Sequence, residues 1–227
     1  MGRSDSLGRP SLAPEAALAE EVGGLVCGID EAGRGPWAGP VVAAAVILDP
    51  GAVPDGLNDS KLLSAAGRER LFGLIAARAR IGVGVASREE VDAFNVLQAT
   101  FRAMARAFAA LSLAPAAALI DGNRAPDLPC PARTLVRGDC LSVSLAAASI
   151  VAKVTRDRMM VALAQECPGY GWERNKGYGT PEHAAALDRL GVTCHHRQSV
   201  EPVREALEAA AKRRGRPRRA PRARANV

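Results

Sequence analysis

The sequence lacks the features that mark secreted, membrane-spanning or nucleoside-triphosphate-binding proteins. Its five cysteines are odd in number and form no CxxC pair, which favours free thiols in a reducing compartment. The longest apolar stretch, near residues 40–48, is too short to span a bilayer. Neither GxGxxG nor GxxxxGK occurs, so a nucleotide-phosphate loop of either type is excluded. We therefore expect a cytoplasmic protein with no membrane partner.

The two ends of the chain differ from its centre. Residues 1–24 contain Pro10 and Pro14 and no continuous apolar run, so they predict a flexible leader and not a signal peptide. Residues 212–227 carry eight basic residues and no acidic one; the rest of the chain has 22 basic against 24 acidic residues, so the net charge of +6 lies in this tail. The tail is expected to be disordered. It either binds phosphates or is a solvated end without a defined role.

The most informative segment places two adjacent carboxylates, Asp30 and Glu31, after an apolar run and before a turn that contains Gly33 and Gly35. Because neighbouring side chains of a strand point to opposite faces, the two acids are expected to share a ligand only if the strand ends there. Glycine lets the backbone of the turn approach a ligand closely. Carboxylate oxygens suit a hard divalent cation, and the alternative is a pair of solvated acids at a strand end.

Two further acids follow short apolar runs. Asp121 ends the run that begins at Ala117, and Asp139 follows the run at residues 134–136. Open α/β sheets bind ligands at the carboxyl ends of their strands, so Asp30, Glu31, Asp121 and Asp139 are expected to gather at one edge. Each of them alone is more readily explained as a turn cap; their coincidence favours a site.

The apolar patterns predict an α/β sheet with a helical C-terminal portion. Ser87 and Glu90 form a capping box ahead of a long helix, whose apolar stripe is expected to pack in the core. Strands are expected at residues 25–30, 40–48, 81–86, 117–121 and 133–136, and helices at 64–79, from 87 onward, 141–166, 181–190 and 200–211.

Several motifs together resemble bacterial ribonuclease HII. In chain order they are GIDEAGRGPWAGPVVAAAVIL, LNDSKLLS, IDGN, RGD followed by SVSLAAASIVAKVTRDR, and NKGYGT, and they cover residues 25 to about 205. The resemblance implies a ribonuclease H-like fold, with a mixed central sheet flanked by helices, and a catalytic domain over residues 25–211. It also implies an endonuclease that hydrolyses the RNA strand of RNA–DNA hybrids and incises 5′ of single ribonucleotides in duplex DNA.

The resemblance further implies which residues form the site. The family's four catalytic carboxylates correspond to Asp30, Glu31, Asp121 and Asp139, which would hold two divalent ions, Mg²⁺ or Mn²⁺. Recognition of the 2′-hydroxyl would fall to the turn Gly33, Arg34 and Gly35 together with Tyr178. Lys61 and Lys153 are candidate phosphate contacts, although lone lysines are ordinarily surface charge. Asp157 pairs as readily with Lys153 through an i,i+4 salt bridge as it supports catalysis.

Two other interpretations compete with this one. Ribonuclease HIII is similar but carries a folded N-terminal substrate-binding domain, for which residues 1–24 are too short. A catalytically silent nucleic-acid-binding protein would not be expected to keep four clustered carboxylates, because they repel a phosphate backbone. A monomer is expected, since no apolar helix stripe remains after the core is assigned.

Overall fold

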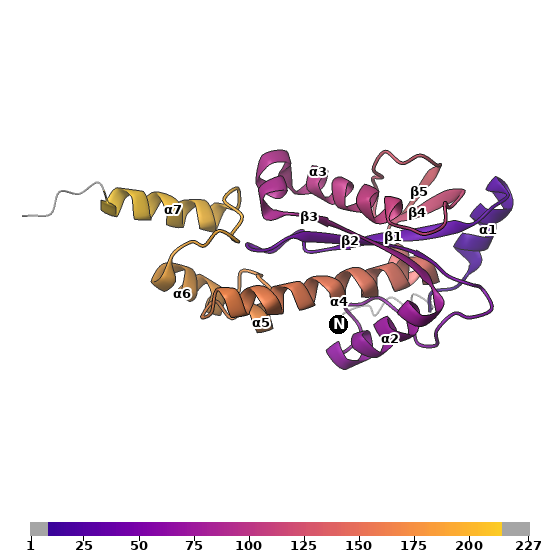
Figure 1. Cartoon of the computed structure of the whole chain (residues 1–227), viewed down its shortest axis with the longest axis horizontal. Coiled ribbons are helices and arrows are strands. Elements are labelled where there is room, and N and C mark those ends of the chain that lie inside the picture. The colour runs from indigo at the N-terminus through magenta and orange to yellow at the C-terminus, as the bar shows by residue number, and fades with distance from the viewer. Residues whose placement is uncertain (1–8, 215–227) are drawn as a thin grey trace, which may run out of the picture.

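A five-stranded mixed sheet forms the centre of the computed structural model, which describes residues 9–214 (Figure 1). The strand order is β3-β2-β1-β4-β5; β1 pairs antiparallel with β2 and parallel with β4, which in turn pairs parallel with β5. The elements are α1 (Ala13–Val22), β1 (Val26–Ala32), β2 (Val41–Ile47), α2 (Ala65–Arg78), β3 (Arg80–Ala86), α3 (Arg88–Ala109), β4 (Ala117–Asp121), β5 (Ala132–Leu135), the 3₁₀ turn η1 (Gly138–Cys140), α4 (Val143–Glu166), α5 (Trp172–Asn175), α6 (Pro181–Leu190) and α7 (Glu201–Arg214). The predicted strands and long helices are confirmed.

Helices cover both faces of the sheet. Helix α3 packs on one face, and α4 with α2 packs on the other (Figure 1). The packing is close because the residues at the contact positions are small. A Cβ atom at Gly84 would lie 2.0 Å from the carbonyl oxygen of Ala103 in α3. On the other face, a Cβ atom at Gly28 would lie 2.5 Å from the backbone of Ser144 in α4. The alanine-rich α4 therefore approaches β1 closely.

Helix α3 has the predicted capping box, but it is not one continuous helix. Asn95 adopts φ 66° and ψ 163°, which interrupts the helix after its second turn. Phe94 is consequently 42% exposed, and the Arg102 guanidinium lies 3.9 Å from its ring centroid. The expectation that the whole apolar stripe packs in the core is wrong at Phe94, because the interruption changes which side of the helix faces the sheet.

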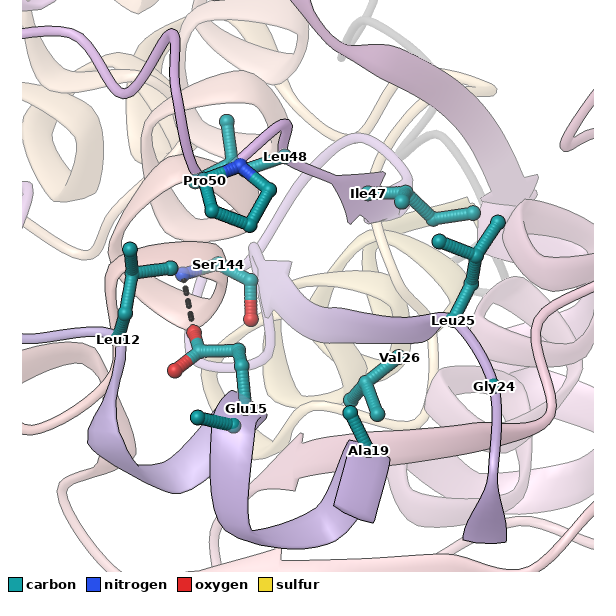
Figure 2. A pocket seen from close by; sticks show the side chains of 11 residues that line it. Leu12, Glu15, Ala19, Gly24, Leu25, Val26, Ile47, Leu48, Pro50 and Ser144 are labelled. Atoms are coloured by element: carbon teal, nitrogen blue, oxygen red, sulfur yellow. Dashed lines mark hydrogen bonds between the residues drawn. The ribbon is translucent and has the colours of Figure 1, made fainter.

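The N-terminal segment is partly ordered, contrary to the expected flexible leader. Residues 13–22 form α1, whose Leu18 is buried. The Glu15 carboxylate accepts a hydrogen bond from the Ser144 N–H at 2.7 Å (Figure 2) and a second one from the Ser142 hydroxyl at 2.5 Å. These contacts anchor α1 to the start of α4, so only the part of the leader at residues 1–8 lies outside the described residues.

At the other end, α7 projects away from the sheet (Figure 1). The helix continues to Arg214, so the basic tail does not begin at Lys212 as expected. The remainder of that tail, residues 215–227, lies outside the described residues. All five cysteines are free, as predicted, while the expected cytoplasmic location stays a prediction. Among the described helices, none combines the length and the apolar character needed to cross a bilayer.

Candidate active site

One pocket at the carboxyl end of β1 and β4 gathers nine of the ten site residues expected from the sequence. Its lining includes Asp30, Glu31, Gly33, Arg34, Gly35, Lys61, Asp121, Lys153 and Tyr178. The tenth residue, Asp139, lies on η1, and its Oδ2 atom is 3.6 Å from Lys61 Nζ at the pocket. The structure thus brings the predicted residues together; their chemical roles stay predictions.

The acids meet where the parallel part of the sheet ends. The β1–β4 ladder ends at the pair Ile29 and Ile120, so Asp30 and Asp121 lie just beyond it. Strand β1 does not end there, however, because its pairing with β2 continues to Ala32. Side-chain alternation is therefore retained: Glu31 also lines a second groove against α3, whereas Asp30 shares its pocket with α4 residues. The expected end of the strand at these acids is therefore found only on the side that pairs with β4, while the pairing with β2 continues past them.

The carboxylates form an electrostatically strained group. Burial and the neighbouring charges of Glu31, Asp121 and Asp139 raise the pKa of Asp30 well above its usual value. Burial also raises the pKa of Asp121, although the Gly138 N–H donates to its Oδ1 atom at 2.7 Å and opposes the shift. A bound cation would relieve this repulsion.

Two oxygen atoms of the group have no protein partner for a hydrogen bond. Glu31 Oε2 and Asp139 Oδ2 are both buried and accept no hydrogen bond within residues 9–214. Unsatisfied buried carboxylate oxygens are costly, and hard divalent cations prefer such ligands. The residues present therefore fit divalent metal ions.

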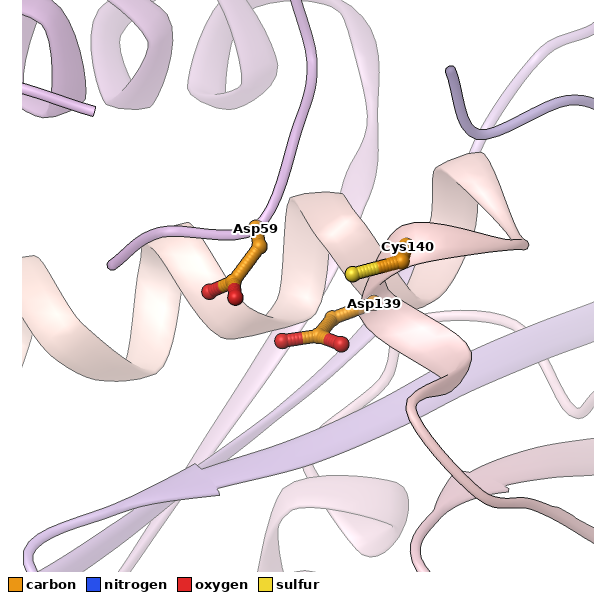
Figure 3. A group of neighbouring side chains, drawn as sticks. All are labelled: Asp59, Asp139 and Cys140. Atoms are coloured by element: carbon orange, nitrogen blue, oxygen red, sulfur yellow. The ribbon is translucent and has the colours of Figure 1, made fainter. Parts of the chain in front are cut away.

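The tightest ligand cluster differs from the predicted one. Asp59, Asp139 and Cys140 each place one ligand atom within 4.8 Å of the other two (Figure 3). No three of the four predicted carboxylates meet this distance within residues 9–214. Burial, followed by the charges of Asp59 and Asp121, raises the pKa of Asp139. Asp59 lies in the predicted Asp-Ser-Lys motif but was not identified as part of the site.

Two buried arginines hold the glycine turn in place. Arg197 donates to the carbonyl oxygens of Gly33 at 2.6 Å and of Arg34 at 2.9 Å, and Arg156 donates to that of Pro40 at 2.9 Å. Both arginines are 1% exposed, and burial lowers the pKa of each guanidinium. Gly33 has φ +100°, and a Cβ atom there would lie 2.0 Å from Arg156 Nε. The turn requires glycine at this position for both reasons.

A histidine pair supports the segment that carries Tyr178. The Thr193 N–H donates to His196 Nδ1 at 3.0 Å, so the proton of that imidazole is on Nε2, 3.1 Å from His183 Nε2. His183 Nε2 also accepts from the Trp172 indole at 3.1 Å, which leaves His183 Nδ1 to donate to the Tyr178 carbonyl at 3.0 Å. Burial lowers the pKa of both histidines, that of His196 to about 4. His183 therefore packs locally against this segment.

The cationic residues lie at the rim of the pocket. Lys61 is 78% exposed, and its Nζ atom lies 3.8 Å from Asp59 Oδ1. Partial burial lowers the pKa of Lys61, but Asp59 and Asp139 more than offset this and raise it. Lys153 forms the predicted i,i+4 ion pair with Asp157 at 2.8 Å, and its Nζ atom lies 6.0 Å from the Tyr178 ring centroid.

Sequence reasoning missed Asp59, Cys140, Arg156, Arg197 and His196. The segments that contain them were visible in the sequence: Arg156 lies in the alanine-rich helix pattern, and His196 and Arg197 lie directly before Gln198. The signal that was absent was burial: an isolated arginine is ordinarily read as a surface residue.

The chain matches the family model described as Ribonuclease HII over residues 27–202. A protein named Ribonuclease HII from Ruegeria pomeroyi is 58% identical over 207 residues, which are 91% of this chain and 88% of that protein. The crystal structure of ribonuclease H2 from Pyrococcus horikoshii OT3 has a TM-score of 0.70 at 26% identity, and the match covers 82% of this chain and 99% of that one. Bst ribonuclease HIII in complex with Mn²⁺ shares the fold at 21% identity, with a TM-score of 0.65 and coverage of 88% and 74%.

Proposed function

Because the chain belongs to the ribonuclease HII family, we propose that it incises duplex DNA 5′ of single embedded ribonucleotides as well as cleaving the RNA of RNA–DNA hybrids. The family consists of endoribonucleases that act on such hybrids, and the fold is that of ribonuclease H. The observation that carries the proposal is the pocket that combines acids, the glycine turn and Tyr178.

We propose that Asp30, Glu31, Asp121 and Asp139 hold two divalent ions, Mg²⁺ or Mn²⁺. When bound, such ions activate a water molecule and stabilise the oxygen that leaves the phosphodiester. The unpartnered oxygens of Glu31 and Asp139 and the raised pKa of Asp30 support this assignment. The Glu31 N–H donates to Asp30 Oδ1 at 2.7 Å, which orients that carboxylate.

The glycine turn is suited to recognise a 2′-hydroxyl through its backbone. Since the Gly33 and Arg34 carbonyls point toward Arg197, the N–H groups of the same planar trans peptide units, those of Arg34 and Gly35, point the opposite way. Neither N–H has an acceptor within residues 9–214. They offer donors to a ribose hydroxyl, which accepts as well as donates hydrogen bonds.

Tyr178 completes the recognition surface. Its side chain is 43% exposed, and a Cβ atom at Gly35 would lie 3.6 Å from Tyr178 Cε1. The ring therefore stands against the glycine turn, where it can stack on the sugar that follows the ribonucleotide. Arg34, Lys61 and Lys153 supply positive charge for the neighbouring phosphates.

The test is incision of a DNA duplex that contains one ribonucleotide, with Mg²⁺, compared with an all-DNA duplex and an EDTA control. We expect cleavage on the 5′ side of the ribonucleotide, and its loss in Asp139→Asn. The matched control is Asp188→Asn, which changes an exposed acid on α6 and should cleave like the wild type. Tight binding without cleavage in Mg²⁺ or Mn²⁺ would contradict the proposed reaction.

We also propose that the protein works as a monomer. Its exposed large apolar side chains come from different elements, for example Leu62, Phe94 and Leu190. Light scattering coupled to gel filtration tests this, and a dimer mass at low micromolar concentration would contradict it.

A further inference from the structure

We propose that Asp59, Asp139 and Cys140 form a second binding site, which shares Asp139 with the four-carboxylate set, for a thiophilic divalent cation of the Zn²⁺ or Cd²⁺ class. Asp59 comes from the segment between β2 and α2, whereas Asp139 and Cys140 come from η1, just before α4 (Figure 3). The fold thus brings together two acids 80 positions apart in the sequence and a thiol beside them.

The geometry of the three side chains suits a single ion. One carboxylate oxygen from each aspartate and the Cys140 sulfur lie within 4.8 Å of one another. Ligand bonds of about 2.0–2.3 Å permit separations of that order with small side-chain movements. Asp139 and Cys140 are 3% and 9% exposed, so most of the site is already desolvated.

A second observation points to a missing ligand. Asp139 Oδ2 is buried and accepts no hydrogen bond within the described chain. The Lys61 Nζ atom lies 3.6 Å from Asp139 Oδ2 and 3.8 Å from Asp59 Oδ1. At 78% exposure this lysine can swing into solvent, which leaves both carboxylates open to a metal ion.

The donor set determines which ion is preferred. Sulfur is a soft ligand that favours Zn²⁺ and Cd²⁺, while Mg²⁺ prefers oxygen ligands alone. On binding, the Cys140 thiol loses its proton to solvent, and the thiolate forms the bond to the metal. Three protein ligands leave a fourth position for water. The Cys140 sulfur is the soft ligand that the four carboxylates assigned to Mg²⁺ do not provide.

Occupancy of this site has a consequence for the nuclease. Asp139 belongs to both ligand sets, so a thiophilic ion would compete with the ions of the proposed reaction. This consequence rests on the proposed function, whereas binding of the ion does not.

The experiment titrates the full-length, metal-free protein with Cd²⁺ and follows the ultraviolet absorbance that a cadmium–thiolate bond produces. We expect one equivalent to bind with this absorbance in the wild type, and Asp59→Asn to weaken binding at least tenfold. In Cys140→Ser the absorbance should disappear, while Cys194→Ser, which removes an exposed thiol, should behave like the wild type. Circular dichroism shows whether each variant is folded.

Excess Mg²⁺ should not displace the bound Cd²⁺, whereas the same excess of Zn²⁺ should. Absorbance that persists in Cys140→Ser, or that never forms in the wild type, would overturn the proposal. The titration needs no nucleic acid, so a protein that binds Cd²⁺ in this way but cleaves nothing would refute the proposed function and leave this site standing.

Discussion

The buried histidine pair makes the stability of the fold sensitive to mild acid. His196 is fully buried, and its Nδ1 atom accepts from the Thr193 N–H, so it has no room for a second proton. Burial, together with the nearby His183, lowers the pKa of His196 from 6.5 to about 4. The folded state therefore binds this proton less readily than the unfolded chain does, and stability falls as the pH decreases from 6.5 toward 4.

The expected loss follows from the pKa difference. At pH 5 the solution is about 1.5 pH units below the pKa of the His196 imidazole in the unfolded chain, so that imidazole is protonated. The folded imidazole, whose pKa is about 4, is still mostly neutral. At about 1.4 kcal/mol per unit, the free energy of unfolding should fall by about 2 kcal/mol between pH 7.5 and pH 5 through this residue.

Urea unfolding followed by tryptophan fluorescence measures this loss, since Trp172 is buried beside the pair. The wild type is compared with His196→Gln, which cannot titrate, and with His195→Gln, whose side chain is 25% exposed in the wild type. Groups remote from the two mutated histidines titrate alike in the three proteins and cancel, and His183 is present in all three. His196→Gln should lose about 2 kcal/mol less than the wild type over this pH range, and His195→Gln should follow the wild type. Equal losses in all three proteins would refute the assignment of a neutral His196.

Five substitutions test the packing and the recognition surface. Ser87→Ala removes the side-chain cap of α3 and should lower the free energy of unfolding by about 1 kcal/mol in urea titrations. Gly84→Ala forces a Cβ atom against the Ala103 carbonyl and should lower the free energy of unfolding by about 1–3 kcal/mol. Gly73→Ala, which has open space on the exposed face of α2, should raise it by up to about 1 kcal/mol. Changes of the same sign in both variants would contradict the packing of α3 on β3. Tyr178→Ala should raise KM for the one-ribonucleotide duplex about tenfold in steady-state assays while Tyr178→Phe stays near the wild type, and an equal loss in both would show that the hydroxyl and not the ring matters.

The sheet was predictable because its strands are short apolar runs with clear ends. The apolar run before Asp121 and the Ser87–Glu90 capping box both appear in the structure where the patterns place them. The parallel neighbours β1, β4 and β5 then bring their carboxyl ends to one edge, which is why strand-end acids could be grouped without a structure.

What the sequence could not show depends on contacts between distant segments. Helix α1 has weak apolar periodicity, and its order comes from Leu18 and from Glu15, which binds Ser142 and Ser144. The break at Asn95 is equally invisible in the apolar pattern, because the residues on both sides of it continue the helical spacing. Cys140 would pass for a small buried residue until Asp59 is placed beside it.

The two buried arginines explain why the glycine turn has a defined shape despite its glycines. A turn of this composition has large conformational freedom, and its carbonyls would be free to point toward a ligand and repel a phosphate. Arg197 alone binds the carbonyls of Gly33, Arg34, Gly39 and Pro40, which fixes four peptide units with one side chain. A guanidinium has a planar set of five donors and can do this, whereas an ammonium cannot present donors in the same directions. Desolvation of Arg197 is tolerated because these carbonyls satisfy its donors. The rigidity of the turn is therefore supplied largely by Arg197, which lies more than 150 positions away in the sequence, and the outward direction of the turn's N–H groups follows from that inward anchoring.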